Sequence, residues 1–146
     1  MITDANLLLS SAQTLIHTDS TVVSTNTVDL GIARDIGEGE NLYVEFDLTI
    51  ALVGGTSVDF QVITSAAEAL TGPVIVGASG PILTADGVIG KRIAVRINPK
   101  IASKGLRYLG AQYVIVGVMS AGAVNANVVK DIQDGQKFYP SGFSVS

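Results

Sequence analysis

The chain contains a single histidine, His17, which lies beside Thr18 and Asp19. A metal site built on paired histidines needs a second imidazole, so that kind of site is excluded. A Ser-His-Asp triad is compatible with the composition, but the sequence has no G-x-S-x-G turn to expose a nucleophilic serine. We therefore expect His17 to be solvent-exposed. A small hydrolase is the weaker alternative, and it would require loss of an activity in His17→Ala.

Acidic side chains suggest two further kinds of site. Residues 35–41 place oxygen ligands on a glycine-rich turn, which suits calcium, but the D-x-D-x-D-G spacing is absent. We expect a solvated loop between strands there. Glu45, Asp47 and Asp59 could supply paired carboxylates for glycoside hydrolysis. All three occupy the polar positions of alternating strands, so we expect them on outer faces rather than in a catalytic pair.

Other sites for ligands are also poorly supported. Residues 87–92, GVIGKR, resemble a phosphate loop, but the first glycine is missing and Arg92 replaces the Ser or Thr that holds magnesium. We expect a turn that enters a strand. Tryptophan is absent and aromatic residues make up 5% of the chain, so stacking platforms for sugars or bases are scarce. We predict no catalytic, cofactor-binding or metal-binding residues, no cofactor, and no enzyme.

Charge is divided unevenly along the chain. Residues 1–86 carry eleven acids and one base, Arg34, whereas residues 87–130 carry seven bases and no acid. Such blocks can form two opposite faces that suit docking onto a partner, or the fold can interleave and neutralise them. Both readings remain open from the sequence. The acidic isoelectric point near 4.7 argues against nucleic acid as a partner.

The length of 146 residues and the 47% hydrophobic content indicate one domain with a sizeable core. We expect a domain over residues 1–146 with short tails at 1–11 and 137–146. No cysteine is present, so disulfides are excluded. Asp4 stands where a signal peptide carries positive charge. Residues 108–129 lack charge, but a turn signal at 120–122 divides them into two paired strands, so we predict no membrane segment.

Strand patterns cover most of the chain. Residues 42–50 alternate strictly between apolar and polar, and after a turn at 53–56 the alternation resumes at 58–63, which we interpret as a hairpin. Further strands are expected at 21–30, 92–97, 106–118 and 123–132, the last two as a pair, with short edge strands at 73–76 and 81–83. The only helical signal is the capping-box spacing of Ser65 and Glu68, within 65–70.

These elements predict an all-β fold, a single antiparallel β-sandwich or jelly roll of about eight strands with at most one short helix. In strand 92–97 the cations Arg92 and Arg96 share the face opposite the core. The residues expected to point inward are Leu42, Val44, Phe46, Leu48, Phe60, Val62, Ile93, Val95, Val114 and Val116.

Several segments resemble the capsid cement (decoration) proteins of tailed bacteriophages, of the Bordetella-phage type. The segments are MITD at 1–4, SAQ at 11–13, STNTVDLG at 24–31, ARDIG at 33–37, ENLY at 40–43, DFQV at 59–62, RYL at 107–109 and YPSGF at 139–143. The resemblance implies a jelly-roll protein on the outer capsid surface of a virion, made in the cytoplasm of the bacterial host. Such a protein binds the major capsid protein and bridges capsomers, without catalysis or a cofactor.

Two kinds of residue are candidates for the partner interface. Lys100, Lys104 and Arg107 belong to the basic block, and Tyr139 and Phe143 are aromatic groups near the chain end. The expected partners are the major capsid protein and further copies of this chain, as a dimer or trimer, with neither nucleic acid nor membrane. A carbohydrate-binding jelly-roll module of a phage tail or virion surface is the alternative function, which glycan binding through Tyr43 or Tyr113 would favour.

Overall fold

The computed structural model describes residues 4–31, 42–97 and 106–130. Within these ranges the chain forms nine strands and two short 3-10 helices, η1 and η2. The strands are β1 (Leu8–Thr14), β2 (Thr21–Val23), β3 (Val28–Asp29), β4 (Tyr43–Gly54), β5 (Ser57–Ser65), β6 (Val74–Leu83), β7 (Arg92–Arg96), β8 (Tyr108–Val116) and β9 (Met119–Val129), and the helices are η1 (Ala5–Leu7) and η2 (Thr84–Asp86).

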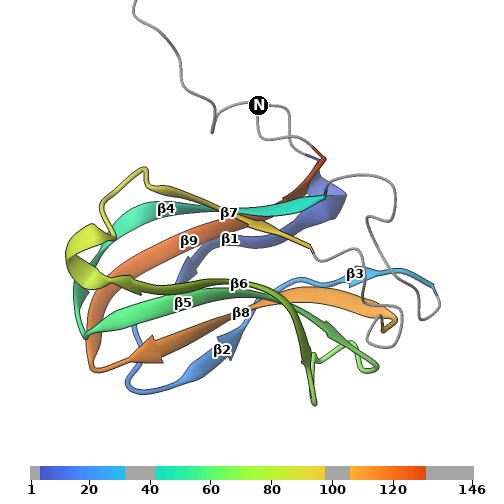
Figure 1. Cartoon of the computed structure of the whole chain (residues 1–146), viewed down its shortest axis with the longest axis horizontal. Coiled ribbons are helices and arrows are strands. Elements are labelled where there is room, and N and C mark those ends of the chain that lie inside the picture. Colours follow the sequence, from blue (N-terminus) through green and yellow to red (C-terminus); the bar gives the residue numbers. More distant parts are fainter. Residues whose placement is uncertain (1–3, 32–41, 98–105, 131–146) are drawn as a thin grey trace, which may run out of the picture.

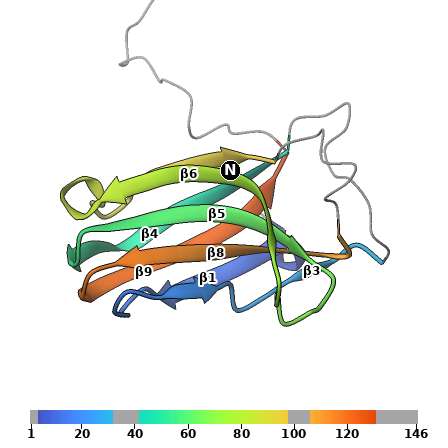
Figure 2. The ribbon, with the colours of Figure 1, turned by 60° about the horizontal axis from the view of Figure 1, so that its bottom comes forward.

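The strands form two antiparallel sheets packed face to face, as Figures 1 and 2 show. Sheet I has the strand order β1-β9-β4-β7, and sheet II has the order β2-β8-β5-β6, with β3 also pairing with β8. This confirms the predicted all-β sandwich. Each sheet buries one face against the other, which is how an alternating strand removes its apolar side chains from water.

Three aromatic rings lie at the centre of the core between the sheets. Phe46 of sheet I is 5.3 Å from Phe60 and 6.0 Å from Tyr113 of sheet II, measured between ring centroids. Phe60 and Tyr113 are 5.8 Å apart in an edge-to-face arrangement, a favoured geometry for aromatic pairs. All three side chains are fully buried. The predicted inward position of Phe60 is therefore confirmed.

The predicted core is correct on β4, β5 and β7 and wrong on β8. The buried cluster contains Val44, Phe46, Leu48, Phe60, Val62, Ile93 and Val95, with Leu42 packed against it. Val114 and Val116 point outward instead, and Val116 is 45% exposed. Beyond Gln112 both faces of β8 are apolar, so alternation over residues 113–118 did not distinguish them. Pairing with β5 decides the face, because Phe60 lies opposite Tyr113 and Val58 opposite Ile115.

The two hairpins expected from the sequence are absent from the fold, and this is its main correction. Strands β4 and β5 are consecutive but belong to opposite sheets, and so do β8 and β9. Each pair is a β-arch, a connection that crosses between the two sheets. Strand β4 instead pairs with β9, and β5 pairs with β8. Alternation of apolar and polar residues is the same in a hairpin and in an arch, so the pattern alone did not separate them.

Glycines allow the two arch turns to pack directly against each other. Gly55 and Gly117 both have positive φ, at 58° and 86°. A Cβ on Gly117 would lie 2.9 Å from the Cα of Gly55 and 3.0 Å from the backbone nitrogen of Thr56, which is closer than real side chains come. The Thr56 N–H donates to the carbonyl of Val116 at 2.7 Å. The turns of the two β-arches therefore pack together as one structural unit.

Three smaller expectations also change. Residues 65–70 form a turn rather than a helix, in which the Ala67 N–H donates to Ser65 Oγ, because a segment this short cannot offset the cost of helix nucleation. Leu8 to Thr14, partly assigned to a tail at 1–11, is strand β1 and pairs with β9. The two short edge segments are parts of one edge strand, β6.

Candidate interaction surfaces

The residues considered for catalysis are dispersed over the structure. His17 lies in the loop between β1 and β2, where its side chain is partly exposed. Glu45 and Asp47 belong to β4 of sheet I, whereas Asp59 belongs to β5 of sheet II. Glu45 is buried and pairs with Arg92 at 3.2 Å. Across residues 4–31, 42–97 and 106–130, no three histidines or acids are grouped so that they could hold a metal ion.

Two of the remaining sequence sites have a clear outcome. The segment 87–92 is a turn that enters β7, as expected, and the N–H of Gly90 donates to the carbonyl of Leu48. Arg92 and Arg96 point outward from β7 while Ile93 and Val95 are buried, which confirms the expected faces. The acidic segment 35–41 lies outside the described residues.

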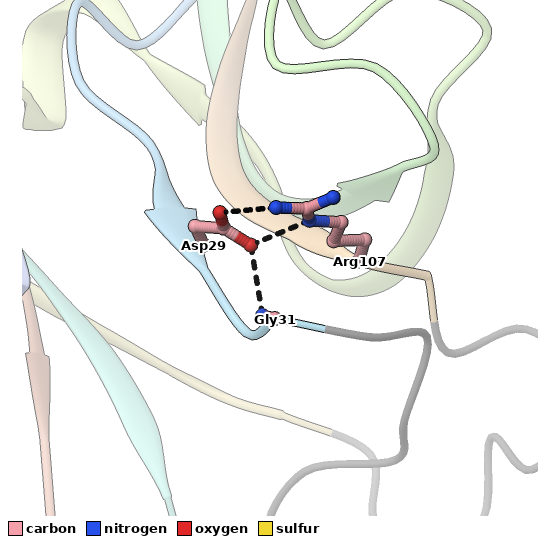
Figure 3. A network of polar contacts seen from close by, with 3 residues as sticks. All are labelled: Asp29, Gly31 and Arg107. Atoms are coloured by element: carbon pink, nitrogen blue, oxygen red, sulfur yellow. Dashed lines mark hydrogen bonds and ion pairs between the residues drawn. The ribbon is translucent and has the colours of Figure 1, made fainter.

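Among the five predicted interface residues, only Arg107 lies within the described part of the chain; Lys100, Lys104, Tyr139 and Phe143 lie outside it. Arg107 forms a bidentate pair with Asp29, in which Nε and Nη2 donate to the two carboxylate oxygens, each at 2.8 Å (Figure 3). The guanidinium carbon also lies 5.1 Å from the ring centroid of Tyr108. Its role in a partner contact stays a prediction.

The Asp29 carboxylate is also held by the backbone, since the N–H of Gly31 donates to it at 2.8 Å. The hydrogen bonds from Arg107 are the largest cause of a lowered pKa, which is about 2 for Asp29, and the Gly31 N–H is the next. The same pair raises the pKa of Arg107. Both side chains are nearly half exposed, so the pair is a surface pair that solvent screens.

This ion pair lies at one end of the sandwich, which we call the loop end. There the Leu30 N–H donates to the carbonyl of Arg107, and the Ile97 N–H donates to the carbonyl of Leu42, both at 2.9 Å. Both ion pairs between described residues, Asp29–Arg107 and Glu45–Arg92, join an acid of residues 1–86 to a base of residues 87–130. At these positions the fold interleaves the two charge blocks.

The opposite end of the sandwich is apolar, and sequence reasoning missed it. We call it the arch end, comprising residues 15–20, 50–57, 83–91 and 116–120, at the left of Figure 1. Nine large hydrophobic side chains are exposed in the described residues, and only Ile75 lies elsewhere. The other eight, each 45–69% exposed, are Ile16, Ile50, Val53, Leu83, Val88, Ile89, Val116 and Val118. The sequence signal that could have revealed this apolar end is the placement of aliphatic residues next to turn glycines.

Hydrogen bonds connect the segments of the arch end. Thr84 Oγ1 donates to the carbonyl of Gly54 at 2.9 Å, and Ser120 Oγ donates to the carbonyl of Val53 at 3.1 Å. Val118 forms a β-bridge with Thr18 of the loop between β1 and β2. The Leu52 N–H donates to the carbonyl of Gly87 at 2.8 Å. The exposed aliphatic groups therefore lie on one continuous framework.

The two outer sheet faces differ in charge. Strands β4 and β7 of sheet I carry two acids and two arginines. In strands β2, β5, β6 and β8 of sheet II, Asp59 is the only charged residue, and β3 adds Asp29 at the loop end. Gln61 donates to Asp59 at 2.7 Å and accepts from Gln112, so this charge belongs to a polar row. The outer face of sheet II is therefore only weakly charged, as is the arch end.

A surface hollow of about 610 Å³ lies near the start of β1. Its lining combines hydroxyl and amide groups with one carboxylate and a few apolar groups, and it includes Asn6, Ser24, Thr25, Asn26 and Glu68. Tyr113, named as a possible glycan contact, is instead fully buried in the core. Burial raises the pKa of its phenol, which lies 2.7 Å from Ser10 Oγ.

Comparison with known proteins identifies the family. Throughout the described ranges, no helix is long and apolar enough to cross a membrane. None of the curated proteins matches the chain. Residues 9–128 match the Bbp16 family, and this region includes nearly all of both sheets. The chain therefore belongs to the Bbp16 family, a Bordetella phage protein family.

Proposed function

We propose that this protein is a capsid cement protein, which binds the outer surface of a phage head and bridges neighbouring capsomers. The observation that carries the proposal is the Bbp16 family match over residues 9–128, which spans the sandwich from β1 into β9. The cement-protein segments of the sequence extend beyond this region to residues 139–143. The family assignment supports a phage structural protein, and the cement role is our inference from it.

The geometry is compatible with a binding role and suggests how it would work. The described side chains at the arch end present apolar groups to solvent, whereas ionisable groups elsewhere are spread over two sheets. Burial of apolar surface against a capsomer stabilises the assembled head because expansion or bursting then exposes that surface again. Many symmetric copies make individually weak contacts collectively strong.

Co-sedimentation with phage heads that lack this protein tests the proposal. We expect the purified chain to pellet with intact heads, to saturate at a fixed ratio to the major capsid protein, and to raise the temperature at which heads rupture. An unrelated β-sandwich of similar size and charge is the matched control and should stay in the supernatant. Absence of the chain from the pellet over a wide concentration range would contradict the proposed function.

A second candidate function is glycan binding, which the hollow near β1 favours. Hydroxyl and amide groups such as those of Asn6, Thr25 and Asn26 can hydrogen-bond to sugar hydroxyls. Binding on a glycan array that is lost in Asn26→Ala would support this function. Equal signals for the wild type and Asn26→Ala would count against it.

A further inference from the structure

We infer that the arch end is the surface through which this chain docks, and that its partner presents an aliphatic protein surface framed by basic groups. The inference rests on the proposed function, in which that partner is the shell of the phage head. It assigns the contact to a part of the molecule that lies opposite the loop end. It also differs from the interface expected from the sequence, which comprised Lys100, Lys104, Arg107, Tyr139 and Phe143.

The first argument is the amount of exposed apolar surface. Ile89 is 69% exposed, Val118 63% and Val88 56%, and five further aliphatic side chains at the arch end are 45–55% exposed. Contiguous apolar patches on monomers are normally limited to roughly 300–600 Å² and often mark interaction sites. Eight of the nine exposed large hydrophobic side chains of the described residues gather at this one end. Keeping them in water costs free energy, which a partner would recover.

The second argument is that the arch end is already ordered for binding. Gly55 and Gly117 are in contact, and a side chain at Gly54 would come within 2.6 Å of the carbonyl of Val118. Backbone and side-chain hydrogen bonds link residues 53–56, 84, 116 and 120. A preorganised surface loses little conformational entropy on association, so more of the apolar burial contributes to affinity.

The third argument concerns charge and selects the kind of partner. Besides His17, the charged residues of the arch end are Asp19, Asp86 and Lys91, two acids against one base. If two copies met through this end, the acidic groups would be brought together, and like charges at an interface disfavour association. A partner with basic groups around an aliphatic centre is complementary instead. The acidic isoelectric point of about 4.7 points the same way.

The experiment compares two matched pairs of variants in the head-binding assay. Ile89→Asn with Val118→Asn makes the arch end polar, and Ile75→Asn with Ala94→Asn changes two exposed positions outside the arch end. Asp86→Lys reverses an acid at the arch end, and Ala66→Lys with Thr71→Lys makes the same change in net charge at exposed residues elsewhere. Melting temperatures of all variants are measured alongside, so that a loss of binding is separated from unfolding.

We expect the double asparagine variant at the arch end to bind heads at least roughly tenfold more weakly, with its melting temperature unchanged. Asp86→Lys should weaken binding several-fold, whereas both control variants should bind like the wild type. If the wild type binds heads and neither arch-end variant binds them more weakly, this inference is overturned and the proposed function stands. If the arch-end variants instead dissociate a wild-type dimer while still binding heads, the occupant is a second copy and the inference is wrong. Failure of the wild type to bind heads would overturn the proposed function and, with it, this inference.

Discussion

At the scale of single residues, Asp29 shows how the unequal charge blocks are reconciled. It comes from the acidic part of the sequence and is held by Arg107 from the basic part and by the N–H of Gly31. The contact joins positions 78 residues apart in the chain. An ion pair so distant in sequence depends on the neighbouring strands β3 and β8, which pair at Asp29 and Tyr108.

This pair predicts a dependence of stability on pH. The pKa of Asp29 is lowered from 3.8 to about 2 in the folded protein, so its contribution is complete above about pH 4 and is lost as the pH falls through 2. The difference in unfolding midpoint between wild type and Asp29→Asn should therefore shrink between pH 5 and pH 2 in urea titrations. Asp86→Asn removes a carboxylate without touching the pair and serves as the control. A difference independent of pH in Asp29→Asn would contradict the assigned pKa.

At the scale of elements, the two β-arches determine the topology. Strand β4 leaves sheet I through Gly54 and Gly55, and β8 leaves sheet II through Gly117. The turns contact each other, so that β4 pairs with β9 while β5 pairs with β8. The same turns carry Val53, Val116 and Val118 outward. Fold and candidate docking surface therefore depend on the same close contact.

Gly117→Ala tests this contact, and Gly90→Ala is its control. Both glycines have positive φ, 86° and 78°, so both substitutions incur backbone strain, which costs on the order of 1–2 kcal/mol. Only at Gly117 would the new methyl group also meet backbone atoms, at 2.9–3.0 Å, whereas nothing lies within 4 Å at Gly90. We expect Gly117→Ala to lower the free energy of unfolding by about 1–3 kcal/mol more than Gly90→Ala does. If chemical denaturation shows equal decreases in the free energy of unfolding for the two variants, the two arch turns can move apart at little energetic cost.

At the scale of the whole molecule, the two ends of the sandwich differ in chemistry. The loop end carries the exposed Asp29–Arg107 pair, and the arch end carries eight exposed aliphatic groups. Ile97 and Arg107, the described residues on either side of Lys100 and Lys104 in the sequence, lie at the loop end. Contacts through the two ends should therefore respond differently to salt.

The basic block provides a prediction at this scale. If Lys100 and Lys104 contact the head, Lys100→Glu with Lys104→Glu should reduce co-sedimentation, and raised salt should weaken wild-type binding because exposed charges are screened over about 8–10 Å. Contact through the arch end alone should weaken less at high salt, since salt screens the acids that border it but not the apolar burial. Head binding is therefore compared between the wild type and the double variant at 0.1 M and at 1 M salt. If neither the double substitution nor the higher salt changes binding, the basic block is excluded from the interface.

The sequence by itself determined the fold class and much of the core. Strict alternation over residues 42–50 correctly placed Val44, Phe46 and Leu48 inside, because neighbouring side chains of a strand must point to opposite faces. The same rule correctly assigned Phe60 and the outward arginines of β7. It also located the turn at 53–56 and the turn into β7. Each of these features depends on residues that are close together in the sequence, so the local pattern of apolar and polar residues predicts it.

Only the tertiary structure decided which strands pair and which surface is apolar. An arch and a hairpin share one alternating pattern, so the choice depends on partners far away in the chain, here β9 for β4 and β8 for β5. Beyond Gln112, strand β8 is apolar on both faces, and its register opposite Phe60 buries Tyr113 and leaves Val114 and Val116 outside. The arch end brings together four separate segments, and two of them meet where Gly117 approaches Gly55. Such contacts follow from close packing of the whole chain, which no single segment specifies.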